Sequence, residues 1–260
     1  MHDLSVTGTT KTALNLRVKV DFTNPTNYSA VIPYFNLHIL HNNSVIGDAT
    51  VRDQLVTPGN VTDFTVDVSW DPAMGGEKGQ VIGRELLSQY ISGYNTTLTV
   101  KLHEDSISHQ PDLGKMLSKY SLTVPWPRVS NPDPETGKEQ HLIRDATFHI
   151  LSKTAQFTLV SPFSHSTIFI DHMNATALYN HTETIGRIIY DEPFKVPPGT
   201  SQSPRLPVDV DGSGMGFPEL RKAIGGNLKL DARGKVTVRL GEWTERVWYV
   251  GEGIGSSIRL

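Results

Sequence analysis

The sequence predicts an all-β protein built from two tandem antiparallel β-sandwiches, each with one short helix. Three observations lead to this fold class. Apolar and polar residues alternate along several segments, short motifs recur in the same order in both halves, and a proline-rich stretch separates the halves. The chain has 260 residues, which is enough for two domains of ordinary size.

Strict alternation of apolar and polar residues dominates the first half. It runs through residues 14–22, 35–39, 64–70 and 98–102. A period of two with one polar face is typical of antiparallel strands that cover a core on one side. Turn-forming pairs, such as Asn24-Pro25, fall between these segments.

Helical spacing is confined to short segments. Arg84–Ile91 has that spacing and is followed by Gly93, a typical helix C-cap. The corresponding segment of the second half is Pro218–Ile224. The glycine-rich run Gly75–Gly79 lacks the spacing of a phosphate-binding loop, and we expect it in a hairpin.

Six motifs of the first half return in the second half at offsets of 134 to 142 residues. Six matches in one order indicate an internal duplication. The pairs are Asn24-Pro25 with Ser161-Pro162, Ile46-Gly47 with Ile185-Gly186, Val56–Gly59 with Val196–Gly199, Val66–Val68 with Val208–Val210, Glu85-Leu86 with Glu219-Leu220, and Thr99–Leu102 with Thr237–Leu240.

The boundary between the two copies is polar and rich in proline. Asn131–Gly137 contains two prolines, which is typical of a short, stiff linker. We therefore predict a first domain at residues 1–128, a linker at 129–139 and a second domain at 140–260.

Composition excludes several classes of function. The net charge is −3, so the chain has no basic footprint for nucleic acid. The absence of cysteine excludes disulfides, thiolate metal sites and a cysteine nucleophile. The first residues have no signal-peptide character, and the chain reads as a fragment of a longer protein.

The positions of the asparagines indicate the cellular compartment of the protein. Six of the twelve asparagines begin an Asn-x-Ser/Thr sequon, against about two expected by chance for 45 serines and threonines. This excess favours a chain exposed to the glycosylation machinery of the secretory pathway. A threonine-rich β protein with accidental sequons is the alternative. The predicted glycosylation sites are Asn27, Asn42, Asn60, Asn95, Asn174 and Asn180.

A search for catalytic or metal-binding motifs finds no candidate that outweighs a structural interpretation. His103-Glu104-Asp105 with His109 has the residue types of a metal or acid–base site, but a solvated loop explains it better. The same holds for His165 and His172 as a pH-sensing pair. We predict no catalytic residues, no metal and no cofactor.

These motifs together resemble the group-2 late embryogenesis abundant domain, also called the water-stress and hypersensitive-response domain. The resemblance rests on Val20–Pro25, Ile46-Gly47, Pro58-Gly59 and Thr99–Leu102, and covers nearly the whole chain as two copies. The second copy departs from it at Ser161, which stands in place of the asparagine. The resemblance implies fibronectin-III/immunoglobulin-like sandwiches without catalytic residues.

The tandem copies with many sequons are most similar to lumenal regions of fungal vacuolar membrane proteins. This similarity implies an ectodomain in the vacuolar or secretory-pathway lumen, with a membrane anchor outside the chain. We expect a non-catalytic lumenal interaction module that docks partner proteins, through an exposed edge strand.

The alternative is a lipid-binding or lipid-transfer domain that holds acyl chains between the sandwich and its helix. The predicted groove consists of a small-sided strand face and two helix residues: Met173, Ala175, Ala177, Leu220 and Ile224. The run Val247–Val250 is apolar on both faces, which fits a central core strand or an interface strand.

Overall fold

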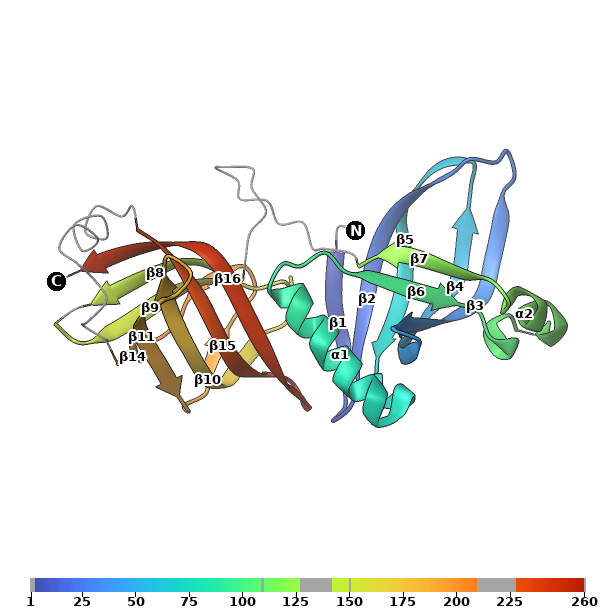
Figure 1. The fold of residues 1–260 in the computed structure, drawn as a ribbon. Helices are drawn as coiled ribbons and strands as arrows, with labels where there is room; N and C mark the ends of the chain where they lie inside the picture. Colours follow the sequence, from blue (N-terminus) through green and yellow to red (C-terminus); the bar gives the residue numbers. More distant parts are fainter. Residues whose placement is uncertain (1–2, 109, 127–141, 150, 210–227, 260) are drawn as a thin grey trace. The chain divides into compact units, whose positions relative to one another are not determined.

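The computed structural model describes residues 3–108, 110–126, 142–149, 151–209 and 228–259 (Figure 1). Strands dominate, and they form two separate sheets, as the alternation predicts. The chain divides into two compact units, which are described one at a time. Unit 1 contains Met1–Leu86, Asn95–Ser130 and Gly241–Trp243, and unit 2 contains Leu87–Tyr94, Asn131–Leu240 and Thr244–Leu260.

Unit 1 holds a seven-stranded sheet in the order β1-β2-β5-β4-β3-β6-β7, with every pair antiparallel. The long strands coincide with the alternating segments of the sequence. The strands are β1 (Asp3–Thr9), β2 (Leu14–Asn24), β3 (Ala30–His41), β4 (Ser44–Val56), β5 (Gly59–Trp70), β6 (Thr97–Lys101) and β7 (Ser121–Pro125).

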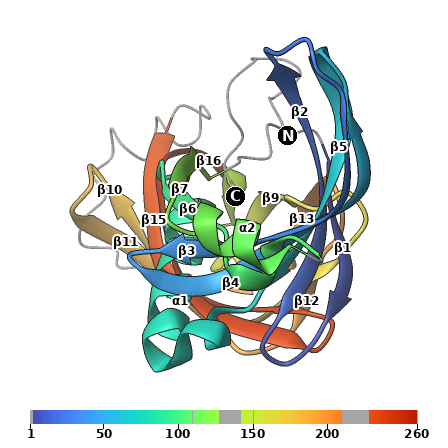
Figure 2. The same cartoon turned by 90° about the vertical axis from the view of Figure 1, so that its right-hand side faces the viewer.

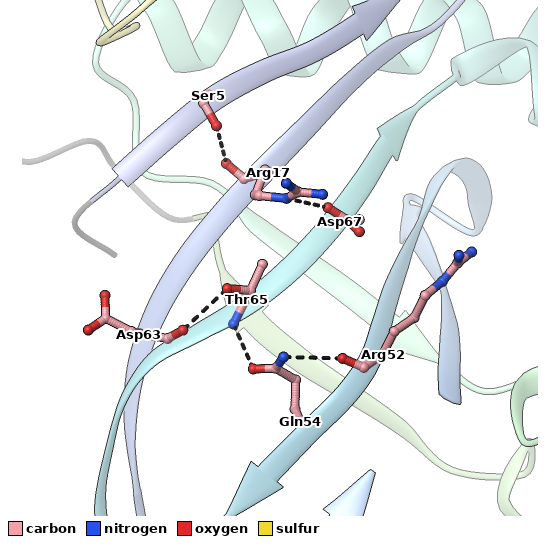
Figure 3. Close-up of polar contacts among 7 residues, drawn as sticks. All are labelled: Ser5, Arg17, Arg52, Gln54, Asp63, Thr65 and Asp67. Atoms are coloured by element: carbon pink, nitrogen blue, oxygen red, sulfur yellow. Dashed lines mark hydrogen bonds and ion pairs between the residues drawn. The ribbon is translucent and has the colours of Figure 1, made fainter. Parts of the chain in front are cut away.

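The sheet of unit 1 divides between β4 and β5. These strands pair only where residues 47–50 meet residues 67–70. Beyond that point Gln54 makes the connection: its Oε1 accepts from the backbone nitrogen of Thr65 at 3.3 Å, and its Nε2 donates to the carbonyl oxygen of Arg52 at 3.1 Å (Figure 3). A buried cluster of Val51, Val61 and Phe64 forms the core here.

Helix α1 (Gly76–Ile91) ends where the sequence predicts but begins eight residues before Arg84. The hairpin predicted for the glycine-rich run is wrong, because Gly75 ends the 3-10 helix η1 (Pro72–Gly75) and Gly76–Gly79 open α1. The glycines allow close packing, since a Cβ on Gly75 would collide with the carbonyl oxygen of Val45.

The residues between β6 and β7 form two further helical segments, η2 (Glu104–Ser106) and α2 (Pro111–Leu117). Both views place α2 beside β3 and β6 (Figure 1 and Figure 2). No described helix of the chain is long and apolar enough to cross a membrane.

Unit 2 holds a sheet in the order β11-β10-β15-β16-β8-β9-β13, with two short strands beside this path. The second predicted helix, Pro218–Ile224, lies outside the described residues. The strands are β8 (Ile143–His149), β9 (Thr154–Val160), β10 (Ile168–Tyr179), β11 (Glu183–Tyr190), β12 (Phe194–Val196), β13 (Thr200–Gln202), β14 (Leu206–Pro207), β15 (Leu228–Leu240) and β16 (Trp243–Arg259).

The strand pairings of the two units correspond in chain order, as duplication predicts. β8-β9, β9-β13, β10-β11, β10-β15 and β15-β16 repeat β1-β2, β2-β5, β3-β4, β3-β6 and β6-β7. Unit 2 also has a parallel pairing that the described strands of unit 1 lack: β16 runs parallel to β8, from Gly255 opposite Asp145 to Arg259 opposite His149.

Two turns also correspond between the copies. Asn42 and Asn180 each begin a turn with φ of 48°, and the next residue again has positive φ. Such turns match the twist of a hairpin, and asparagine tolerates their backbone. Gly59, the first residue of β5, and Gly199, which directly precedes β13, have φ of 80° and 77°. The repeated Pro-Gly motif therefore marks one backbone position in both copies.

Ser161 performs locally what Asn24 performs in the first copy. The Oδ1 of Asn24 accepts from the backbone nitrogen of Thr26, two residues on, at 3.1 Å. The Oγ of Ser161 accepts from the backbone nitrogen of Phe163 at 3.2 Å. Each side chain thus satisfies backbone groups after the strand, so the substitution preserves the turn.

The run Val247–Val250 is a core strand, the first of its two predicted alternatives. It belongs to β16, which pairs with β8 only at Gly255–Arg259, and the backbone nitrogens of Trp248 and Val250 donate to Ser88 Oγ and Ser92 Oγ at 3.1 and 3.0 Å. Val247 and Tyr249 are buried, whereas Trp248 and Val250 are partly buried.

Candidate binding surfaces

The connection between the last two strands differs most between the copies. In unit 2, β15 and β16 are joined by Gly241 and Glu242 alone. In unit 1, residues 102–120 separate β6 from β7 and carry η2 and α2. We call residues 102–120 the η2–α2 insertion. Loops on a conserved framework are where binding residues concentrate.

The η2–α2 insertion and the strand after it expose four large apolar side chains. They are Leu113, Met116, Tyr120 and Leu122, with exposed fractions of 36%, 54%, 70% and 62%. Leu113 and Met116 are one turn apart and share a face of α2. We call these four residues the insertion surface. Exposed apolar side chains that form one contiguous patch mark interaction sites.

Side chains fix the insertion to the outer face of β3. Asn36 Nδ2 donates to Asp48 Oδ1 at 3.1 Å and to Thr50 Oγ1 at 2.8 Å, so its Oδ1 is left to accept. His103 Nε2 lies 2.6 Å from that oxygen. The imidazole of His103 also stacks on that of His38, with ring centroids 4.2 Å apart.

Exposed apolar residues are concentrated in unit 1. Ten of the thirteen large apolar side chains exposed in the described residues belong to it. A second group, Phe22, Tyr28, Val31 and Leu55, lies at the ends of β2, β3 and β4 and in the loop from β2 to β3. Sequons flank this second group, because Tyr28 is the middle residue of the Asn27 sequon and Asn60 pairs with Thr23. The sequence contains no sequon between Asn95 and Asn174, so the insertion surface has none.

Five of the six predicted glycosylation sites are exposed: Asn27, Asn42, Asn60, Asn95 and Asn180. Asn174 is partly buried, and its Oδ1 accepts from Arg187 Nε and Nη2 at 3.4 and 3.3 Å. Attachment of a glycan at Asn174 would have to displace or accommodate this arginine. Whether any of the six is modified stays a prediction.

The predicted lipid groove is described only on its strand side. Met173 is buried, and Ala177 packs against the buried cluster of Ile185, Leu228 and Leu230. Ala175 pairs with Gly234, where a Cβ would lie 2.8 Å from the Cα of Ala175. Leu220 and Ile224 lie outside the described residues. Of the strand side, Met173 and Ala177 therefore contribute to the protein core.

Within the described part of the chain, no group of three or more His, Asp or Glu side chains is placed to hold a metal ion. His103 is bound to Asn36, and His109 lies outside the described residues. His172 Nδ1 is paired with Asp191, whereas His165 is exposed on a loop. The two members of the predicted pH-sensing pair therefore have different surroundings.

Sequence reasoning missed the insertion surface, because it treated residues after His103 as a solvated loop. Two signals were available. Pro111 at the first helical position, followed by Leu113, Met116 and Leu117, has helical spacing. Asp112 in the first turn and Lys115 in the last turn also favour a helix here.

Two family models match the chain in tandem. Residues 1–115 match the Tag1-like fourth LEA-2 like domain, and residues 135–248 match the Tag1-like fifth LEA-2 like domain. The chain is a tandem of LEA-2-like domains. This confirms the resemblance to group-2 late embryogenesis abundant domains. Domains of this family are in general non-enzymatic modules.

No curated protein matches the LEA-2 tandem. Among solved structures it is similar to the periplasmic chaperone SfaE, at 11% identity, 93% coverage of each chain and a TM-score of 0.15. It is also similar to the BSP domain of a biofilm associated protein, at 9% identity and a TM-score of 0.15, covering 97% of this chain and 51% of that one.

Proposed function

We propose that the LEA-2 tandem is a non-catalytic interaction module of an endomembrane lumen and that it docks a partner protein through the insertion surface. The observation that carries this proposal is the exposure of Leu113, Met116, Tyr120 and Leu122 on an insertion that only one copy has. A framework duplicated without this insertion has no need of it for folding.

Charges around the insertion surface indicate the chemistry of the partner. Lys115 and Lys119 directly precede Met116 and Tyr120, whereas Asp112 directly precedes Leu113, and all three charged residues are exposed. A partner that presents apolar anchors flanked by charges of both signs would complement this arrangement. The anchors would supply most of the affinity, because exposed charges at the rim contribute little.

The proposed compartment is a vacuolar or secretory-pathway lumen, in a fungal ectodomain anchored to a membrane by a segment outside this chain. Its support is the sequon count and the exposure of five of the six asparagines. Glycans at Asn27 and Asn60 would cover the second apolar group of unit 1. The sequon-free insertion surface would remain accessible.

Lipid binding is the rival function, and the described residues favour it less. Met173 is buried and Ala177 packs against a buried cluster, so less of the predicted groove is available to an acyl chain. Native mass spectrometry of the purified chain, followed by lipid extraction, tests it directly. A stoichiometric lipid would support the rival and weigh against a purely protein-docking role.

Site-specific photo-crosslinking in the source organism tests the docking proposal. A photo-crosslinking residue in place of Met116 is compared with one in place of Ile189, which is 51% exposed in unit 2 against 54% for Met116. We expect a discrete crosslinked protein from position 116 and none from position 189. The partner is then identified by mass spectrometry and purified.

Affinity for the purified partner decides the outcome. Met116→Asp should weaken binding about tenfold or more, as truncation or charging of an interface anchor does. Ile189→Asp should leave it unchanged. Equal affinity of the wild type and Met116→Asp, or crosslinks from position 189 alone, would refute the insertion surface as the docking site.

A further inference from the structure

The insertion is held to the sheet by two stacked imidazoles. His38 lies on β3, opposite Asp48 of β4 and Lys101 of β6. His103 is the residue that directly precedes η2. Their ring centroids are 4.2 Å apart and their planes are inclined by 18°. Two neutral rings tolerate this stack, whereas two protonated rings repel each other at this separation.

The position of His103 is fixed from both sides. Asn36 holds its Nε2 at 2.6 Å, and Asn36 is itself oriented by Asp48 and Thr50. On the insertion side, the backbone nitrogen of His103 donates to Ser106 Oγ at 2.6 Å. His103 therefore joins the sheet to η2 and has little freedom to move away from His38 without breaking these contacts.

Helix α2 is packed directly on the segment that His103 begins. A Cβ on Gly114 would collide with the carbonyl oxygen of Glu104 and would lie 2.9 Å from that of His103. Gly114 is buried by this contact. A movement of His103 away from β3 therefore carries α2, and with it Leu113 and Met116.

We infer that His38 and His103 form a pH-sensitive latch that holds the η2–α2 insertion against β3 at neutral pH and releases it when both imidazoles are protonated. Its consequence for partner binding rests on the proposed function, because the latch controls how the insertion surface is presented. The release itself does not depend on a partner.

The charged groups around the latch come from every neighbouring element. Asp48 of β4 favours a charged His38, and Lys101 of β6 lies opposite His38 in the sheet. Glu104 and Asp105 of η2, and Asp112 and Lys115 of α2, complete the set. Burial, followed by the proximity of His103, lowers the pKa of His38 despite Asp48. The folded state thus favours a neutral His38 in the stack.

Amide hydrogen exchange of the purified chain between pH 7.5 and 5.0 tests the latch. After correction for the intrinsic exchange rate, peptides from residues 102–120 should lose protection about tenfold at the acidic end. His38→Phe keeps an aromatic ring in the stack without a titrating group, so protection should not change with pH. His165→Asn, at an exposed histidine of unit 2, should behave as the wild type.

Unchanged protection of residues 102–120 at pH 5.0 would overturn the latch, and so would an equal loss in His38→Phe. His103→Phe is the second variant if His38→Phe does not fold. The latch and the docking proposal fail separately. Met116→Asp should weaken docking about tenfold or more while preserving the pH response of exchange, and His38→Phe should preserve docking at neutral pH.

Discussion

The two copies of the LEA-2-like domain share a framework and differ in how their last hairpin is connected. Gly241 and Glu242 suffice in unit 2, whereas unit 1 uses residues 102–120 and exposes apolar side chains there. Unit 2 instead adds a parallel pairing of β16 with β8, which the described strands of unit 1 lack. One copy has an exposed apolar surface and the other an additional parallel strand pairing, so duplication preserved the framework while the connection between the last two strands diverged.

The largest expected effect tests whether the frameworks are equivalent. Ile46 and Ile185 occupy matching motifs, with exposed fractions of 0% and 4%. Truncation of either to alanine should cost about 2–5 kcal/mol of unfolding free energy, because each leaves a cavity in a packed core. Urea unfolding measures the total loss of unfolding free energy, and hydrogen exchange shows which unit has lost it. Tolerance at one position but not at the other would break the proposed equivalence.

A buried carboxylate distinguishes unit 2. Asp231 is 5% exposed, and it binds His181 Nδ1 at 2.6 Å and the backbone nitrogen of Gly253 at 3.0 Å. Asp231→Ala should cost about 1–3 kcal/mol, since it leaves the Gly253 amide without its acceptor. Asp191→Ala is the matched control, because Asp191 pairs with His172 at an exposed site. Asp231→Ala should therefore lower the melting temperature more than Asp191→Ala does. Equal decreases in the two variants would contradict this expectation.

The two asparagine turns provide a smaller contrast. Asn43 and His181 occupy the same turn position, with φ of 62° and 67°. Asn43→Gly should stabilise unit 1 slightly or leave it unchanged, because glycine adopts this backbone without strain. His181→Gly should destabilise unit 2, because it loses the bond to Asp231. Denaturant midpoints measured in parallel would show opposite or unequal shifts, and matched shifts would mean that the Asp231 bond is weak.

Acid should destabilise both units, through different neighbours. In unit 1 the pKa of His38 is lowered first by burial and second by the nearby His103. In unit 2 the pKa of His149 is lowered first by burial and second by the positive charges of Arg205 and Arg259. The unfolded chain then binds more protons than the folded one below the ordinary histidine pKa of 6.5, so stability falls as pH decreases through that value. Urea midpoints at pH 7.5, 6.5 and 5.5 measure this. His38→Gln should reduce the pH dependence of stability in unit 1 alone, and His149→Gln should reduce it in unit 2 alone. A change in the other unit would show that the pH dependence has been assigned to the wrong histidine.

Glycosylation does not depend on these stabilities and tests the compartment. We expect glycans at Asn42 and Asn180, which are exposed at corresponding turns. Peptide mass spectrometry of the protein from its source organism measures occupancy. Unmodified asparagines at all six sequons would contradict a lumenal location.

Local pattern predicted the framework well, because each strand covers a core with alternate side chains. The residues 14–22, 35–39 and 64–70 all lie in strands, and Gly59 and Gly199 share a backbone conformation that the Pro-Gly repeat indicates. Position along the chain could not show that Gly75 and Gly79 serve close packing of α1. That requirement comes from Val45 and Pro72, which touch them only in the folded state. The insertion surface was missed for a related reason, since exposure of Leu113 and Met116 depends on what α2 packs against.

A loop exchange tests most directly whether the insertion, and not the duplicated framework, binds the partner. Residues 102–120 are replaced by Gly-Glu, the connection that unit 2 uses between β15 and β16. We expect unit 1 to remain folded, with the β3 and β4 amides still protected in hydrogen exchange. Affinity for the crosslinked partner should fall at least about tenfold. A folded chimera that binds the partner as tightly as the wild type would contradict it.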